Sequence, residues 1–291
     1  MERKIGTYTI NGQTIEYSIT GKGEIPILVM HGGHSNCYEE FGYAPLMKRG
    51  CTIITPSRAG YGSTSKKIGE SLSAACEIYV KLLNYLGIGK VHLLSISAGG
   101  PSGIYFASHY PERVKTLTLQ SAITKEWYRP KDKIYQMAQI LFHPYLERMT
   151  WKLTSSMSNC FPKFMFKQLA SSFSNLPYKK IKEKMLESDM EEIRRMNNRQ
   201  RSGHGFLIDL SQTKEITAKD LHAITCPTLI IHSRHDGVVS LEHAHYAHQE
   251  IPDTRLCVLD TWGHLIWLGK ASEDADVKFA EFLIYYARSD K

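Results

Sequence analysis

Three polar side chains stand at the ends of runs that predict β-strands: Ser97, Asp236 and His264. Because the carboxyl ends of parallel strands meet at one edge of a sheet, we expect these side chains to lie close together. A serine hydroxyl is a weak nucleophile until a base removes its proton, and an imidazole titrates near neutral pH. A carboxylate behind the imidazole holds the required tautomer and stabilises the imidazolium. The three residue types therefore predict nucleophilic catalysis of acyl transfer.

The residues around Ser97 predict a sharp turn between a strand and a helix. An apolar run at 91–94 leads into Ser-Ile-Ser-Ala-Gly at 95–99, and a helical pattern continues to about residue 110. Ser95 and Gly99, two positions before and after Ser97, are small, and a sharp turn has no room there for large side chains. This segment resembles the Gly-x-Ser-x-Gly nucleophile elbow of the α/β-hydrolase family, with Ser95 in place of the first glycine.

The resemblance extends to a second glycine-rich turn. The apolar run 25–30 ends in His-Gly-Gly-His at 31–34, and in the family a His-Gly turn after this strand supplies one amide of the oxyanion hole. Carried over by position, the donors are the N–H groups of Gly33 and Ala98. Such donors stabilise the negative charge that develops on the carbonyl oxygen. In the loop 57–64 only the two glycines match the family pattern, so we expect this loop to be structural.

The order Ser97, Asp236, His264 is also the order of the family's triad. Some relatives carry the acid one strand earlier, near residue 120 of this chain, where the sequence has no carboxylate. Glu126 is the nearest alternative. We therefore expect Asp236 to be the acid.

Several histidines near Asp236 raise the question of a metal site. His232 and His235 stand beside it in the sequence, and His243, His245 and His248 follow at spacings that a helix surface explains. No carboxylate or cysteine completes a ligand set at the usual zinc spacing. We therefore expect no metal and no cofactor.

The wider pattern predicts the elements that position these residues. Strand-like and helix-like runs alternate over 1–123 and again over 216–291, which predicts a mostly parallel sheet flanked by helices. Residues 124–215 lack this alternation and contain seven of the ten methionines and twelve of the thirty aromatic residues. The resemblance implies an α/β-hydrolase core in 1–123 and 216–291 and an inserted helical lid in 124–215. The apolar side chains of this segment predict either an adaptable pocket or the lid's own core, and both remain open.

Composition limits the partners and the location. The net charge is +7, and residues 124–223 alone contain 18 Lys and Arg against 11 Asp and Glu. This surplus fits an anionic substrate, an acidic surface or a solvated face, and no basic run is dense enough to predict nucleic-acid binding. No stretch is apolar enough for a membrane span, and the N-terminus lacks a signal-peptide pattern. The six cysteines contain no CxxC pair, so we expect reduced thiols and a cytoplasmic protein.

Together, these features favour a serine hydrolase of the carboxylesterase kind. It would cleave a small-molecule ester, or a related acyl bond, through an acyl-enzyme. The resemblance leaves open an acyltransferase, a peroxidase-like enzyme or a carbon–carbon bond hydrolase on the same triad. A ligand-binding protein that kept the fold without catalysis is a further alternative. The acyl chain, the alcohol group and the oligomeric state do not follow from the sequence.

Overall fold

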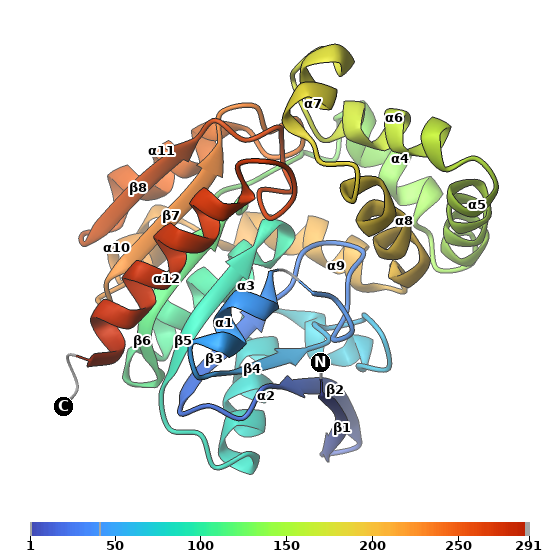
Figure 1. The fold of residues 1–291 in the computed structure, drawn as a ribbon. Helices are drawn as coiled ribbons and strands as arrows, with labels where there is room; N and C mark the ends of the chain where they lie inside the picture. Colours follow the sequence, from blue (N-terminus) through green and yellow to red (C-terminus); the bar gives the residue numbers. More distant parts are fainter. Residues whose placement is uncertain (1, 41, 289–291) are drawn as a thin grey trace.

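The computed structural model describes residues 2–40 and 42–288 and has an eight-stranded sheet at its centre (Figure 1). The strand order is β1-β2-β4-β3-β5-β6-β7-β8. Neighbouring strands from β4 to β8 in this order are parallel, whereas the pairs β1–β2 and β2–β4 are antiparallel. The prediction of a mostly parallel sheet is therefore confirmed. The strands are β1 (Arg3–Ile10), β2 (Gln13–Thr20), β3 (Ile25–Met30), β4 (Cys51–Pro56), β5 (Val91–Ile96), β6 (Val114–Gln120), β7 (Thr228–Ser233) and β8 (Thr254–Leu259).

Helices cover both faces of the sheet because its central strands are apolar on both sides. In β3, Leu28 and Met30 pack into one core, and Ile27 and Val29 pack into the other, since successive side chains of a strand point to opposite faces. The first core lies under α2 (Leu72–Tyr85), α3 (Gly100–His109), α10 (Ala218–His222) and α11 (Leu241–Glu250), and the second under α1 (Tyr43–Lys48) and α12 (Ser272–Arg288).

A helical segment is inserted between β6 and β7, and it lies beyond the sheet in the upper right of Figure 1. The charged residues of 179–201 have the spacing of a single helix, but the structure divides this run into two helices. The first helix ends where the backbone of Met185 becomes extended (φ −90°, ψ 158°), and a new helix begins at Asp189. The helices are α4 (Lys133–Leu141), α5 (Glu147–Cys160), α6 (Pro162–Ser172), α7 (Tyr178–Lys184), α8 (Asp189–Arg199) and α9 (Gly205–Gln212).

The inserted helices share a core with the loop that follows β8. Phe166 of α6 and Ile193 of α8 pack in one cluster with Trp262 and Leu265. The insertion is thus packed against the segment that contains His264. None of the helices among the described residues is both long enough and apolar enough to cross a membrane.

Candidate active site

Ser97 lies at the turn between β5 and α3, and the backbone of this turn is unusual. Ser97 has a positive φ of 50°, which side chains other than glycine rarely adopt. At Gly99 an added Cβ would lie 2.1 Å from the carbonyl oxygen of Met30, so only glycine fits this close approach. The short helical turn Ser97–Gly99 leads directly into α3. The predicted sharp turn is therefore present.

The departure from the family pattern at Ser95 is accommodated by a glycine one helical turn into α3. A Cβ added at Gly103 would lie 1.7 Å from Ser95 Oγ. The missing side chain at Gly103 thus leaves room for the hydroxyl at Ser95. This hydroxyl is buried and has no hydrogen-bond partner among the residues that the structure describes.

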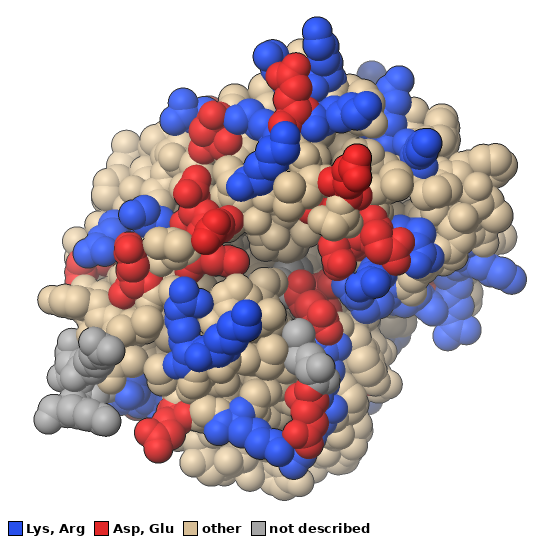
Figure 2. All heavy atoms as spheres, viewed as in Figure 1, with Lys and Arg blue, Asp and Glu red and all other residues tan. Residues whose placement is uncertain are grey.

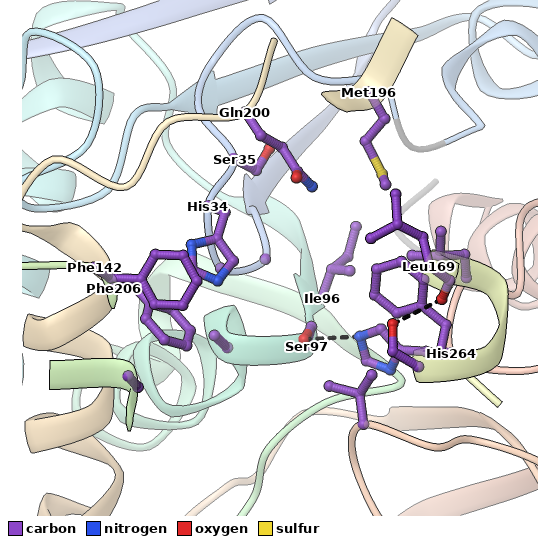
Figure 3. Close-up of a pocket in the computed structure, with 18 of the residues that line it drawn as sticks. His34, Ser35, Ile96, Ser97, Phe142, Leu169, Met196, Gln200, Phe206 and His264 are labelled. Atoms are coloured by element: carbon purple, nitrogen blue, oxygen red, sulfur yellow. Dashed lines mark hydrogen bonds between the residues drawn. The ribbon is translucent and has the colours of Figure 1, made fainter. Parts of the chain in front are cut away.

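The structure brings Ser97, His264 and Asp236 into one hydrogen-bonded chain. Figure 3 shows its first bond, between Ser97 and His264. Ser97 Oγ is 2.9 Å from His264 Nε2, and His264 Nδ1 is 2.7 Å from Asp236 Oδ2. All three residues are buried, and Ser97 and His264 line a cavity. Because the carboxylate accepts from Nδ1–H, Nε2 is free to accept the serine proton.

Asp236 is held in its charged form although it is buried. Burial alone would raise its pKa, but the charge of His264 and the hydrogen bonds from His232 and His264 outweigh burial and lower the pKa well below its usual range. Its second oxygen, Oδ1, accepts the N–H groups of Val238 and Val239, each at 2.8 Å. A carboxylate with these partners is ionised at neutral pH.

A loop from the insertion holds the backbone beside Asp236 and at His264. The carbonyl oxygen of Phe173 accepts the N–H of Gly237 at 3.1 Å and that of His264 at 2.9 Å. The two glycines permit this approach, because a Cβ at Gly263 would lie 2.5 Å from Phe173 O and one at Gly237 2.7 Å from Ser174 N. Sequence reasoning missed Phe173; the glycines beside Asp236 and His264 were the only signal of a close backbone approach.

The Gly32–Gly33 turn packs against the turn at Ser97. A Cβ at Gly32 would lie 3.3 Å from Ser97 Cβ, and one at Gly33 would lie 3.6 Å from Ala98 Cβ. Within the described parts of the chain, the N–H groups of Gly33 and Ala98 donate to no acceptor. Both residues line the same cavity as Ser97. Two unused amide donors therefore lie beside Ser97.

A buried ion pair anchors this glycine turn, and sequence reasoning missed it. Arg58 Nε donates to the carbonyl oxygen of His31 at 2.7 Å, and the N–H of Arg58 donates to His31 Nε2 at 2.9 Å. Arg58 Nη2 also bonds Asp209 Oδ2 of α9 at 2.7 Å, and the hydroxyl of Tyr61 donates to the same oxygen at 2.6 Å. Burial disfavours a charged guanidinium, but Asp209 outweighs burial and raises the pKa of Arg58 above its ordinary value.

The cavity beside Ser97 has a volume of about 540 Å³ and a mostly apolar wall. None of the described residues that line it is Lys or Arg. Glu39 is the one carboxylate among the lining residues that the structure describes, and it is paired with Arg199 at 2.6 Å. The apolar lining comes largely from the insertion and includes Trp127, Tyr128, Met137, Phe142, Trp151, Leu169, Phe173, Met196, Phe206 and Leu210.

His34 lies on the cavity wall opposite His264, against Phe142 and Phe206 (Figure 3). Burial lowers its pKa to about 3, so the ring is neutral. Its Nδ1 is 2.8 Å from Ser202 Oγ, and this hydroxyl also accepts Trp151 Nε1–H at 2.7 Å. Among the described residues, His34 Nδ1 is the acceptor within reach of the Ser202 hydroxyl proton, so we assign the ring proton of His34 to Nε2.

The remaining candidates lie outside this group. Glu126 is exposed and pairs with Arg129 at 3.4 Å, so it is not behind His264. The prediction that a helix surface explains His243 is wrong, because this side chain is buried and its Nδ1 accepts the N–H of Thr124 at 3.1 Å. Over residues 2–40 and 42–288, no group of three or more His, Cys, Asp or Glu side chains could hold a metal ion.

Comparisons with known proteins agree with this architecture. Residues 25–271 match the sequence profile of the alpha/beta hydrolase fold. An uncharacterized hydrolase of Bacillus subtilis, YcgS, is 59% identical over 97% of this chain and 99% of its own length. The 2-hydroxy-6-oxo-6-phenylhexa-2,4-dienoate hydrolase of Comamonas testosteroni is 26% identical over 93% of this chain and 91% of its own length. An alpha/beta hydrolase fold protein from Nakamurella multipartita superposes with a TM-score of 0.81 at 23% identity, over 96% of this chain and 99% of that one. The chain therefore belongs to the α/β-hydrolase family.

Proposed function

We propose that this protein is a serine hydrolase that cleaves uncharged carboxylic esters through an acyl-enzyme. The observation that carries the proposal is the chain of hydrogen bonds from Ser97 through His264 to Asp236 at the floor of an apolar cavity. This arrangement has the order and the geometry that activate a serine hydroxyl.

The reaction follows from these contacts. His264 takes the proton of Ser97 as the oxygen attacks the ester carbonyl, and Asp236 stabilises the imidazolium. The N–H groups of Gly33 and Ala98 stabilise the oxyanion, and each such donor lowers the barrier by about 3–4 kcal/mol. His264 then gives its proton to the departing alcohol. In the second half, a water activated by His264 releases the acid from Ser97.

The insertion acts in this proposal as a helical lid, with residues 124–215 as the lid and residues 1–123 and 216–291 as the core. Side chains of α4, α6, α8 and α9 supply much of the cavity wall. Other apolar residues of the segment, such as Phe166 and Ile193, pack in the cluster shared with Trp262 and Leu265. Met196 belongs to both the cavity wall and this cluster, so the two interpretations of the apolar content overlap.

The wall favours a substrate without charge. A carboxylate or phosphate in the cavity would lose its hydration, and the described lining offers no Lys or Arg to replace it. The polar side chains of the wall include His34, Ser35 and Gln200, and we assign a donor role to the Nε2–H of His34. It would hydrogen-bond a neutral oxygen of the acyl or alcohol group, which suits an ester with a second carbonyl or ether oxygen.

Carbon–carbon bond hydrolysis is the second candidate, because the relative from Comamonas testosteroni is named for that class of substrate. Its substrate, a dienoate, carries a carboxylate. A cation close to the carboxylate would be needed to bind it in a dry pocket. The absence of Lys and Arg from the described lining supports the ester first.

A fluorophosphonate probe tests the nucleophile. We expect labelling of the wild type at Ser97 and none of Ser97→Ala, whose fold is verified by its thermal unfolding. A folded wild type that takes no label would refute the proposal and favour a non-catalytic binding protein.

Substrate panels then separate the reactions. Nitrophenyl esters of increasing chain length, assayed with and without an alcohol acceptor, distinguish hydrolysis from acyl transfer. The dienoate is assayed in parallel. Faster turnover of the dienoate than of any ester would overturn the ester assignment and leave the triad in place.

A further inference from the structure

Exposed apolar side chains are concentrated on one part of the insertion. The described residues include sixteen large apolar side chains that are exposed, and ten of them lie in residues 134–164. The most exposed are Tyr145 (88%), Met149 (69%), Leu153 (65%) and Ile140 (62%). We call the outward side chains of residues 134–164 the α4–α6 surface. Isolated exposed apolar residues are ordinary, but a concentration of this kind marks an interaction site.

Helix α5 shows that this exposure is built into the fold. Its buried positions are Glu147, Trp151 and Ser158, whereas Met149 and Leu153 face outward. Asn197 Nδ2 donates to Ser158 Oγ at 2.9 Å, and Glu147 pairs with Arg201, so the two buried polar side chains have partners within the insertion. A helix in water normally buries its apolar side chains. Met149 and Leu153 depart from this rule and are suited to an apolar environment.

The charge of the same segment is positive. Residues 134–164 contain three cations, Arg148, Lys152 and Lys163, and one acidic residue, Glu147. Glu147 is buried and paired with Arg201 at 2.8 Å, so it does not offset the outer charge. In the part of the chain that the structure describes, Arg148 and Lys152 on α5 are exposed and form no ion pair. Figure 2 shows a largely uncharged area where Figure 1 places α5, with Lys and Arg above and below it.

The α4–α6 surface adjoins the cavity. Ile134, Met137 and Leu141 of α4 are exposed at 57%, 58% and 43%, and the same residues line the cavity beside Ser97. Thr150 Oγ1 of α5 donates to the carbonyl oxygen of Leu141 at 3.0 Å, which ties the start of α5 to the end of α4. The exposed apolar residues thus run from the cavity wall onto α5.

We propose that the α4–α6 surface docks on lipid bilayers with anionic headgroups. Apolar side chains that emerge beside Lys and Arg match the acyl boundary and the negative headgroups of such a bilayer, as in helices that lie in a membrane interface. Docking places the cavity wall formed by α4 at the lipid surface, so lipid-dissolved apolar molecules reach the cavity without crossing water. The docking itself does not depend on ester hydrolysis.

Vesicle co-sedimentation tests this proposal. We expect the full chain to bind vesicles of phosphatidylglycerol and phosphatidylcholine, to release with rising salt, and to bind pure phosphatidylcholine far more weakly. Removing each cation in Arg148→Gln or Lys152→Gln should lower the partition coefficient by about fivefold. The double variant Met149→Gln/Leu153→Gln should lower it by about tenfold or more. None of the four substituted residues lines the cavity. The rate of hydrolysis of a water-soluble nitrophenyl ester should therefore stay unchanged in these variants.

Matched controls lie at distant sites. Ile5→Gln changes an apolar side chain that is 43% exposed on β1, and Lys90→Gln removes an exposed cation just before β5. Both should bind vesicles like the wild type. Equal binding by the α4–α6 variants and the wild type, or equal losses in the controls, would overturn the proposal. The proposal would also fail if the wild type bound no vesicles. If that wild type sedimented as a dimer and Met149→Gln/Leu153→Gln as a monomer, the α4–α6 surface would bind a second copy of the chain.

Discussion

The buried pair of Arg58 and Asp209 offers the sharpest test of how the glycine turn is positioned. Arg58→Met removes the guanidinium that bonds the His31 carbonyl and leaves Asp209 without its ionic partner. Asp209 is only 5% exposed. An uncompensated buried charge typically costs 3–5 kcal/mol, so the free energy of unfolding should fall by about 4 kcal/mol.

The double variant Arg58→Met/Asp209→Leu separates stability from positioning. With both charges replaced by apolar groups, most of the lost free energy should return, to within about 1–2 kcal/mol of the wild type. The contact with His31 does not return. Gly33 follows His31 by two residues, so a displaced turn would misplace its N–H. A displacement of about 1 Å at a catalytic group lowers the rate about 100-fold. We therefore expect kcat to stay about 100-fold low in the stable double variant.

Two measurements decide the outcome: urea unfolding for stability, and ester hydrolysis at saturating substrate for kcat. A double variant that recovers both would refute the reasoning, because the turn would then hold its position without Arg58. A double variant that recovers neither the free energy of unfolding nor kcat would contradict the expected recovery of stability. The hydrogen bonds of Arg58 and Asp209 would then stabilise the fold beyond the balance of their two charges.

Three further predictions address other residues. Gly99→Ala should lower the free energy of unfolding by about 3 kcal/mol or more, because the new Cβ would lie 2.1 Å from the carbonyl oxygen of Met30. The control is Gly89→Ala, where an added Cβ has nothing within 4 Å. In the same urea unfolding assay it should change the free energy by less than about 0.5 kcal/mol. His34→Phe removes the proposed Nε2–H donor, so kcat/KM should fall about three- to tenfold for esters with an added ether oxygen. It should not fall for plain alkyl esters of equal length. Equal losses for both kinds of ester would contradict the role of His34 as a donor. Burial raises the pKa of Asp276 from 3.8 to about 6, so the folded state binds its proton more tightly and loses stability as pH rises from about 4 to 6. Asp276→Asn should therefore raise the thermal midpoint at pH 7 and leave it unchanged near pH 3, and the opposite pH dependence would contradict this sign.

The fold and the three triad candidates could be predicted because their signals are local. An apolar run followed by a small-residue turn marks a strand end, and this pattern placed Ser97 without knowledge of any distant contact. Parallel pairing then brings separate strand ends to one edge, so Asp236 and His264 followed from topology. The family membership is confirmed by the profile match. The catalytic roles of the triad and of Gly33 and Ala98 stay predictions, and the structure contributes the distances that make them testable.

The parts that sequence reasoning missed all depend on contacts between distant segments. Arg58 and Asp209 are 151 residues apart, and Ser202 lies 168 residues from His34. No periodicity links such pairs, so nothing in either segment indicates the other. The error at His243 has the same origin: its helical spacing fits an exposed helix face, but the packing of α11 turns it toward Thr124.

In the proposed reaction, the insertion connects substrate choice to the geometry of catalysis. It supplies much of the cavity wall, and it also supplies the Phe173 carbonyl that binds the N–H groups of Gly237 and His264. Phe173 follows α6 directly, so a shift of α6 that reshapes the cavity would also move the carbonyl oxygen that holds His264. Changes in the insertion should then alter kcat together with KM, because the residues that select the substrate and those that hold His264 belong to one packed unit.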